Sequence, residues 1–362
     1  MRAPIERVDV RVCTLATENG PESDGTAVWD ATTMVIVEPR AGGVTGLGYS
    51  YITGAAATVV RDLLAPVVVG SDAFAIPATM TAMMHAIRNH GRAGVVACAV
   101  SAVDTALWDL KAKLLGVPLA DLFGAARTHV PVYASGGFTS SDLGALSAEL
   151  AGYRAQGHRR VKIKIGREPE KDPERVRVAR EVLGPDIELM VDANGAYTAS
   201  RAIELAQRFA EYGVSYFEEP VTSDDLASLG LVRKRIPPGI SIAAGEYGYD
   251  GWYFQRMLDA NAVDILQADS TRALGFTGFL QADALCRARS MPLSSHCAPS
   301  LHAHVGAAAT QLVHLEYFRD HWRMEELLFE GALPVVHGAL AYDHTRPGLG
   351  LVLREKEAAR HA

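Results

Sequence analysis

Polar residues recur between Val161 and Glu316, each at or near the end of a short apolar run. The runs are VKIKIG, ELMVDAN, YFEEP, SIAAGE, ILQAD, PLSSH and HLEYF, and the polar residues lie 20 to 28 positions apart. These residues are Lys164, Asp192, Glu218, Glu246, Asp269, His296 and Glu316. A strand of about 5 residues, a helix of about 12 and two short loops fill such an interval. The period therefore predicts repeated strand–helix units and a parallel sheet.

One more strand candidate, VPVYAS, ends at Ser135, so the chain offers eight. Eight parallel strands that alternate with helices close into a (β/α)8 barrel. The reactive side chains of such barrels lie at the C-terminal ends of the strands. We therefore expect the seven polar residues to converge on one site, although they span positions 164 to 316.

The chain has 362 residues, more than the roughly 250 that a barrel of this kind needs. Residues 1–55 alternate in three runs typical of an antiparallel sheet, and residues 55–125 have helical spacing of apolar side chains. We predict an α+β domain at 1–125, a barrel at 126–320, and a C-terminal segment at 321–362 whose extra strands leave the barrel and return to the first domain. Asp104, in an almost wholly apolar helix, is predicted to be a buried hydrogen-bonded acid.

Composition excludes several classes of partner. The net charge is −7 and no long basic run occurs, which argues against nucleic acid or an anionic membrane. The four cysteines form no CxxC pair, so neither a zinc site nor a disulfide framework is indicated. No signal peptide and no apolar run of about 20 residues is found. We expect a cytoplasmic protein.

Carboxylates end three successive strand candidates, at Asp192, Glu218 and Glu246. Adjacent strand ends would bring these like charges together, where they repel one another unless a cation binds between them. Carboxylate oxygens suit a hard divalent cation such as Mg²⁺. An ion pair or a helix cap could explain one such acid, but three acids at successive strand ends are explained less well by three separate roles of this kind. We therefore predict a metal site, with Glu219 pointing to the other side of its strand as a supporting residue.

Two lysines, Lys162 and Lys164, are two positions apart on one strand candidate, so their side chains share a face. The interleaved Val161, Ile163 and Ile165 would face the helices, which leaves the lysines inside the barrel. Held together near a metal, each lysine should lower the pKa of the other. One of them would then be a usable general base near neutral pH.

A histidine and an acid end the seventh and sixth strand candidates, at His296 and Asp269. An acid beside a histidine fixes its tautomer and raises its basicity, so the pair indicates a base and not a structural histidine. Lys164 and His296 would then lie on opposite sides of the barrel mouth. Glu316, on the eighth strand, would either donate to a developing oxyanion when protonated or form an ion pair that closes the barrel. These parts suit abstraction of a proton α to a carboxylate, because a metal and a lysine can neutralise the dianion.

A long polar loop, TENGPESDGTAVWD, occupies residues 17–30 between the first two strand candidates. Loops of this length inside a domain are usually functional or disordered. It is either a mobile surface loop or a lid whose Glu22, Asp24 or Trp29 touches the substrate.

Several motifs resemble those of the mandelate racemase group of the enolase superfamily: VKIKIG, VDANGAY, YFEEP, AAGE and SSHCAP. SAVDTALWDLKAKLLGVPLADLFG resembles the segment that leads into the barrel of that family. The resemblance covers nearly the whole chain. It implies an α/β protein: a (β/α)8-type, TIM-like barrel with an α+β capping domain formed by the N-terminal segment and the C-terminal tail. Dimers or octamers would also be expected.

The resemblance also implies roles for individual residues. Asp192, Glu218 and Glu246 would bind Mg²⁺, and Lys164 and the His296–Asp269 pair would be the two acid–base catalysts. Lys162 would assist at the substrate carboxylate with Asn194 nearby, Glu316 would be the electrophilic acid, and the 17–30 loop would set specificity. The glycine pair after Ser135 departs from the family pattern, so which residue there meets the substrate carboxylate stays open.

The reaction remains open among three possibilities with the same two bases. These are dehydration of a sugar acid to a 2-keto-3-deoxy acid, racemisation or epimerisation of a 2-hydroxy acid, and cycloisomerisation. We favour the dehydratase, with a small carboxylate as its substrate. A metal-bound binding protein without catalysis has no need for two opposed bases.

Overall fold

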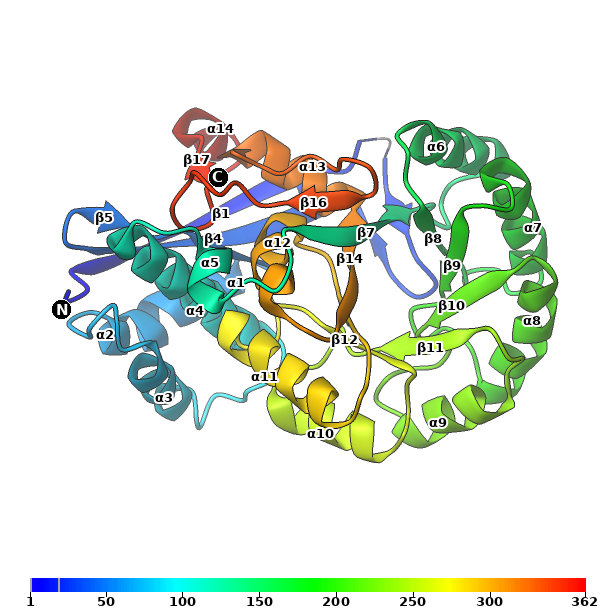
Figure 1. Ribbon diagram of the computed structural model, residues 1–362, viewed down its shortest axis with the longest axis horizontal. Helices are drawn as coiled ribbons and strands as arrows, with labels where there is room; N and C mark the ends of the chain where they lie inside the picture. The colour runs from blue at the N-terminus through cyan, green and yellow to red at the C-terminus, as the bar shows by residue number, and fades with distance from the viewer. Residues whose placement is uncertain (1, 19) are drawn as a thin grey trace.

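Eight parallel strands form a closed barrel in the computed structural model, which describes residues 2–18 and 20–362 (Figure 1). They are β7 His129–Gly136, β8 Arg160–Lys164, β9 Glu188–Asp192, β10 Val214–Glu218, β11 Ser241–Ala244, β12 Ile265–Ala268, β13 Leu293–Ser295 and β14 Leu312–Phe318. Each strand pairs with the next along the chain, and β14 pairs with β7 to close the ring. The barrel prediction is confirmed.

The alternation of side chains along β8 separates the two faces of the barrel wall. Val161 and Ile163 belong to the apolar cluster between strands and helices, whereas Lys162 and Lys164 are buried on the opposite face. Beneath them, an inner apolar layer fills the barrel with Tyr133, Met190, Tyr216 and Ala243. The register pairs Lys164 with Asp192, so these two charged side chains lie side by side at the C-terminal strand ends.

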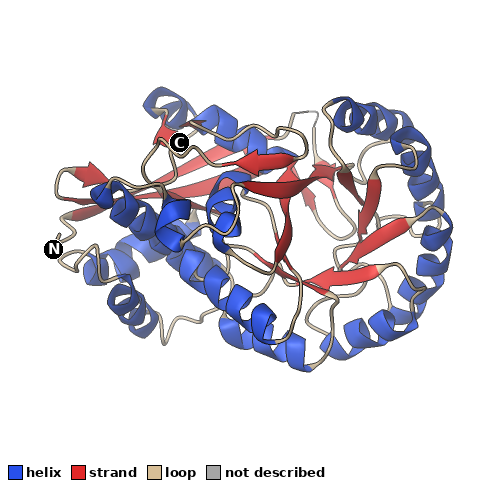
Figure 2. Cartoon of the chain, in the orientation of Figure 1, coloured by secondary structure: helices blue, strands red, loops and turns tan. Residues whose placement is uncertain are grey.

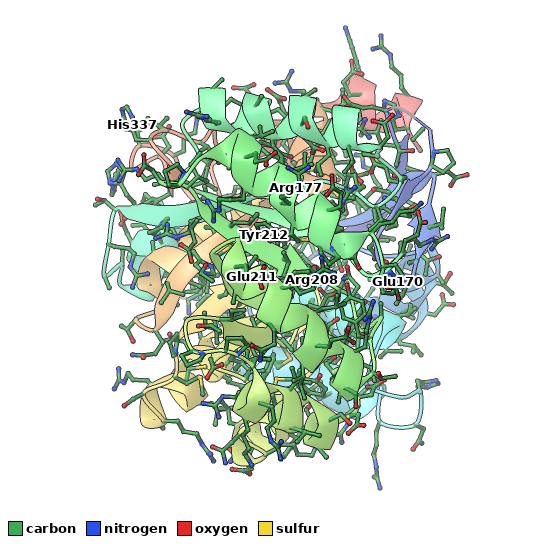
Figure 3. All side chains as sticks on the ribbon, turned by 90° about the vertical axis from the view of Figure 1, so that its right-hand side faces the viewer. Glu170, Arg177, Arg208, Glu211, Tyr212 and His337 are labelled. Carbon is green, nitrogen blue, oxygen red and sulfur yellow. The ribbon has the colours of Figure 1, made fainter. Side chains whose placement is uncertain are left out.

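Helices surround the barrel and follow its strands (Figure 2). They are α6 Leu143–Ala155, α7 Asp172–Leu183, α8 Ala199–Glu211, α9 Leu226–Arg235, α10 Gly251–Asp259, α11 Gly275–Ala288, α12 Pro299–Ala308 and α13 Arg319–Leu328. Helix α8 buries Leu205 and Phe209, while its Arg208 and Glu211 lie on the outer surface with Arg177 of α7 (Figure 3). None of the described helices is long and apolar enough to cross a membrane.

An antiparallel sheet and a set of helices form the N-terminal part. The sheet contains β1 Arg7–Ala16, β4 Ala31–Ala41, β5 Val44–Thr45 and β6 Gly48–Tyr51. The helices are α1 Ala55–Val59, the π-helical η1 Val60–Leu64, α2 Ala65–Val68, α3 Ile76–Ala86, α4 Val95–Leu115 and α5 Leu119–Phe123. The short β5 adds a fourth strand to the three expected. Helix α4 packs against β4 and β6 on one side and α11 on the other, so it joins this part to the barrel.

The C-terminal tail differs from the expectation that its strands leave the barrel. β16 (Ala339–Ala341) instead pairs antiparallel with the first half of β7. β15 (Phe329–Glu330) and β17 (Val352–Leu353) pair with each other. The return to the N-terminal sheet is made by α14 (Glu355–Arg360), where Arg11 of β1 forms an ion pair with Glu355 at 2.5 Å.

Asp104 of α4 is the buried hydrogen-bonded acid that the sequence predicts. Its two carboxylate oxygens accept from the hydroxyl and the backbone N–H of Thr277 at 2.7 and 3.0 Å. A side chain at Gly275 would collide with this carboxylate, and φ at Gly275 is 76°, so only glycine fits there. Burial raises the pKa of Asp104 to about 7.

The first prediction concerns this pKa. The folded state holds the Asp104 proton up to about pH 7, whereas the unfolded chain releases it near pH 3.8. Proton binding by Asp104 therefore stabilises the folded state, and this stabilisation is complete below the lower pKa. It is lost as pH rises toward 7, by roughly 1.4 kcal/mol per pKa unit at most. Asp104→Asn cannot ionise, so its free energy of unfolding relative to wild type should increase between pH 5 and pH 8 in urea denaturation. A difference that does not change with pH would contradict the assignment.

Candidate active site

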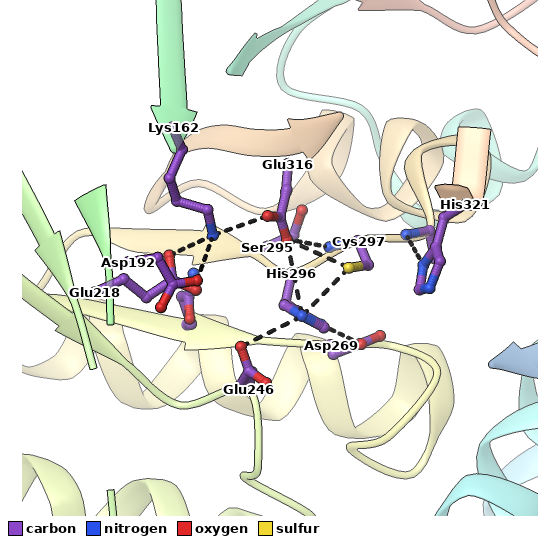
Figure 4. A network of polar contacts seen from close by, with 12 residues as sticks. Lys162, Asp192, Glu218, Glu246, Asp269, Ser295, His296, Cys297, Glu316 and His321 are labelled. Atoms are coloured by element: carbon purple, nitrogen blue, oxygen red, sulfur yellow. Dashed lines mark hydrogen bonds and ion pairs between the residues drawn. The ribbon is translucent and has the colours of Figure 1, made fainter. Parts of the chain in front are cut away.

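Three buried carboxylates meet at the C-terminal end of the barrel (Figure 4). Asp192 ends β9, Glu218 ends β10, and Glu246 lies two residues beyond β11; one ligand oxygen of each is within 4.8 Å of the others. Glu218 Oε1 and Glu246 Oε2 have no hydrogen-bond partner among the described residues. Burial and the nearby Asp192 raise the pKa of Glu218 to about 8. Orphaned, mutually repelling oxygens fit a divalent cation.

The two lysines of β8 contact these acids. Lys162 Nζ lies 2.7 Å from Glu218, 2.8 Å from Glu316 and 3.3 Å from Asp192. Lys164 Nζ donates to Asp192 Oδ2 at 2.6 Å. Burial alone would lower the pKa of both lysines, but the surrounding carboxylates outweigh it and raise both. As expected, the charge of Lys162 lowers the pKa of Lys164, but the carboxylates outweigh this contribution.

The histidine and acid at the ends of β13 and β12 form a pair. His296 Nδ1 lies 2.8 Å from Asp269 Oδ2. Burial opposes ionisation of Asp269, but the hydrogen bond to His296 and the charges of His296, His302 and Arg272 together lower the pKa of Asp269. An ionised carboxylate can only accept, so Nδ1 carries the proton and Nε2 faces Glu246 Oε2 at 3.4 Å. Despite burial, Glu246 and Asp269 raise the pKa of His296, as expected.

Glu316 is held in an ion pair. Its Oε1 contacts Lys162, and its Oε2 accepts the backbone N–H of Cys297 at 2.9 Å. Burial would raise the pKa of Glu316, but Lys162 and His296 lower it well below its usual range. Of the two predicted alternatives, the structure shows the ion pair. The electrophilic-acid role, which needs a protonated carboxyl, stays a prediction.

A cavity of about 400 Å³ opens above these groups, between the barrel mouth and β4. Seven of the predicted site residues line it: Asp24, Trp29, Lys164, Asn194, Glu246, His296 and Glu316. Four others lie outside the lining: Lys162, Asp192 and Asp269 each contact a lining residue, and Glu218 contacts Lys162. Lys164 and His296 therefore line one cavity from strands β8 and β13, which are separated by two strands in the ring.

The 17–30 loop reaches this cavity through a short hairpin of β2 (Glu22–Ser23) and β3 (Val28–Trp29). Residue 19 lies outside the described residues. Trp29 donates from Nε1 to Asp320 at 3.2 Å and packs edge-on against Phe138. The loop therefore lies over the barrel mouth, as the lid interpretation predicts.

Two candidate substrate contacts, Glu22 and Ser135, lie outside the cavity lining. Glu22 is outside the cavity lining, because its carboxylate turns toward Arg319 and forms an ion pair at 3.3 Å. Ser135 shares the inner face of β7 with Tyr133, yet it is fully buried beneath the cavity, and its hydroxyl has no hydrogen-bond partner in the described part of the chain.

Other residues at the site were missed or misplaced by sequence reasoning. Arg272 contacts Glu246 at 3.1 Å and Asp269 at 3.7 Å, and Tyr247 and Cys297 also line the cavity. Arg272 lies three positions after a strand-end acid, which could have indicated it. Glu219 was expected to point away, but its φ of 36° breaks the strand alternation. Burial and the charges of Glu246 and Asp192 raise the pKa of Glu219.

Comparison with known proteins agrees with this fold and site. The family described as mandelate racemase / muconate lactonizing enzyme, N-terminal domain, matches residues 7–124, and enolase C-terminal domain-like matches residues 145–357. The chain is 31% identical to an arabinonate dehydratase of Saccharolobus solfataricus, covering 86% of each. It is 34% identical to a 3,6-anhydro-alpha-L-galactonate cycloisomerase of Streptomyces coelicolor, covering 88% of each.

Solved structures are similar over almost the whole chain. A mandelate racemase/muconate lactonizing enzyme-like protein from Rubrobacter xylanophilus is 53% identical, with a TM-score of 0.97 and 99% of each chain covered. A racemase from Streptomyces coelicolor A3(2) with bound magnesium is 31% identical, with a TM-score of 0.93 and the same coverage. The fold and site define a capped barrel with a carboxylate metal site. The chain belongs to the mandelate racemase and muconate lactonizing enzyme group of the enolase superfamily.

The second prediction tests the metal site directly. Glu218→Gln removes a charge from the carboxylate set, so titration calorimetry with Mg²⁺ or Mn²⁺ should show affinity at least about tenfold weaker, which is ~1.4 kcal/mol. Glu188→Gln is the matched control, because Glu188 lies at the other end of β9 from Asp192 and bonds Arg160 and Ser215. Equal affinities for both variants would contradict the assignment.

Proposed function

We propose that this protein catalyses Mg²⁺-dependent abstraction of the proton α to a carboxylate, in the dehydration of a sugar acid to a 2-keto-3-deoxy acid. One observation carries the proposal: Lys164 and His296, which is paired with Asp269, line the same cavity from different strands, beside the carboxylate set. Magnesium held by Asp192, Glu218 and Glu246 would stabilise the enediolate charge and offset the negative charge that raises the pKa of Lys164. The magnesium-bound relative supports this cofactor.

The two bases would divide the proton transfers. One base takes the α-proton, which leaves an enediolate. His296, oriented by Asp269, then donates a proton to the β-hydroxyl as its C–O bond breaks, and water leaves. The resulting enol takes up a proton at carbon and becomes the 2-keto-3-deoxy acid. Lys162 and Asn194 would bind the substrate carboxylate, and Glu316 would hold Lys162 in place.

The upper wall of the cavity supports a substrate with several hydroxyls. Thr32 of β4 and Thr53 after β6 line it. Their hydroxyls can both donate and accept hydrogen bonds, as the distal hydroxyls of a sugar acid require. The acid-sugar dehydratase among the relatives agrees with this chemistry. Racemisation and cycloisomerisation use the same bases and remain outcomes of the test.

The test is incubation with Mg²⁺ in D₂O and a panel of aldonic and aldaric acids, followed by NMR. A 2-keto-3-deoxy product supports the proposal. Deuterium uptake at the α-carbon without loss of water would replace it with a racemase or epimerase, and a ring-opened isomer would replace it with a cycloisomerase. If no acid of the panel shows either exchange or product, the result contradicts proton abstraction.

The third prediction separates the two bases. Lys164→Ala and His296→Asn should each stop α-proton exchange on one face of the substrate, because the two groups enter the cavity from different strands. Exchange of each stereoisomer in D₂O, followed by NMR, measures this. Normal exchange of both stereoisomers by either variant would rule out the two-base arrangement.

The fourth prediction concerns specificity. Asp24 lines the cavity, where its charge would disfavour a second carboxylate on the substrate. Asp24→Ala should therefore raise kcat/KM for di-acids relative to mono-acids and leave metal affinity unchanged. Glu22→Ala is the matched control: it breaks the ion pair with Arg319, outside the lining, and should affect all substrates alike. The same change of preference in both variants would refute the role of Asp24.

A further inference from the structure

A second group of ligand-type side chains adjoins the carboxylate set. The thiol of Cys297 lies 3.2 Å from His296 Nε2 and 3.4 Å from Glu316 Oε2, and these last two atoms are 3.9 Å apart. All three residues are buried and all three line the cavity (Figure 4). The ligand atoms of this cluster are a nitrogen, a sulfur and an oxygen, whereas those of the carboxylate set are all oxygens.

The separations match the bond lengths of one metal. Three atoms at these distances are equidistant from a point about 2 Å from each, given their measured separations. Zinc–nitrogen and zinc–oxygen bonds are about 2.0–2.2 Å long, and zinc–sulfur bonds are about 2.3 Å. Small shifts of the three side chains would bring all three bonds to these lengths. A thiolate and an imidazole also favour zinc-like cations over magnesium.

The groups behind the ligands already hold them in place. Asp269 accepts from His296 Nδ1, which fixes the tautomer that leaves Nε2 free to bind a metal. Glu316 is held by Lys162 through its other oxygen and by the backbone N–H of Cys297.

The backbone explains why neighbouring residues face the same point. Adjacent side chains of a strand point to opposite sides. Cys297 and Ala298 have φ of 53° and 42°, which breaks the alternation after β13. His302 of α12 fixes this turn, because its Nδ1 contacts the Cys297 carbonyl at 2.7 Å and its Nε2 accepts from the Ser270 N–H at 2.9 Å.

We propose that His296, Cys297 and Glu316 form a second metal site, for a zinc-like divalent cation, that shuts down the histidine base. As the metal–sulfur bond forms, the Cys297 thiol loses its proton to solvent, and His296 Nε2 gives its lone pair to the metal. The fourth position opens into the cavity. Because His296 cannot then accept or donate a proton, a zinc-like cation would act as an inhibitor even when magnesium saturates the carboxylate set. Metal binding here does not depend on which reaction the protein catalyses.

Cobalt provides the test, because Co²⁺ bound to a thiolate absorbs in the near ultraviolet. Wild-type protein with saturating Mg²⁺ should show this charge-transfer band with one Co²⁺ per chain, and Zn²⁺ should remove it. Cys297→Ser should lose the band. Cys286→Ser is the matched control: Cys286 is equally buried but lies on α11 outside the cluster, and the band should remain. Glu218→Gln should also keep it, because it alters only the carboxylate set.

Competition with a chelator measures affinity for Zn²⁺. Asp269→Asn, which removes the group that orients His296, should weaken binding by about 10–100-fold. No charge-transfer band in wild-type protein would overturn the proposal whether or not the variants fold. A band that persists in Cys297→Ser would also overturn it. In a wild-type crystal soaked in Zn²⁺, an anomalous peak beside Sγ would support the site, and a peak only among Asp192, Glu218 and Glu246 would overturn it.

Discussion

An imbalance of buried charge at the barrel mouth governs the structure of the site. Six buried carboxyl groups gather there: Asp192, Glu218, Glu219, Glu246, Asp269 and Glu316. Their neighbours with positive charge, among the described residues, are Lys162, Lys164, Arg272 and His296 when protonated. The acids outnumber these groups, and burial makes each unpaired charge costly. Burial and this excess of negative charge raise the carboxyl pKa of both Glu218 and Glu219. A divalent cation would nearly balance it.

The sequence predicted the parts of the site that depend on strand periodicity. Lys164, Asp192, Glu218 and His296 lie where a strand ends or just beyond it, so topology alone brings them together. Their chemical types then narrow the choice to a metal and two bases. The same reasoning placed Asp104 in a buried helix, because polar residues in an apolar helix must find partners.

The remaining features depend on geometry that periodicity does not encode. Glu219, Cys297 and Ala298 adopt positive φ, which departs from the extended conformation on which strand alternation depends. Such backbone strain gathers at functional sites, where alternation rules fail. Glu22 was misplaced because the sequence does not show that the loop forms a hairpin, nor that Arg319 of α13 attracts its charge. The net rise in the pKa of Lys162 depends on acids from three other strands, β9, β10 and β14, which strand periodicity does not place at given distances.

The cap is part of the site as well as its cover. Tyr49 and Tyr51 of β6 donate to Glu325 of α13 at 2.7 and 3.2 Å, and Tyr51 stacks on His321 with ring centroids 3.4 Å apart. Glu325 also accepts from the Ser300 backbone, at the start of the helix that follows His296 and Cys297. Glu325 is buried at this junction, and burial raises its pKa to about 7. Strand β6, whose Tyr51 lines the cavity, is therefore bonded through Glu325 to the start of α12, which follows the histidine base. Movement of the cap and placement of the base are therefore mechanically linked.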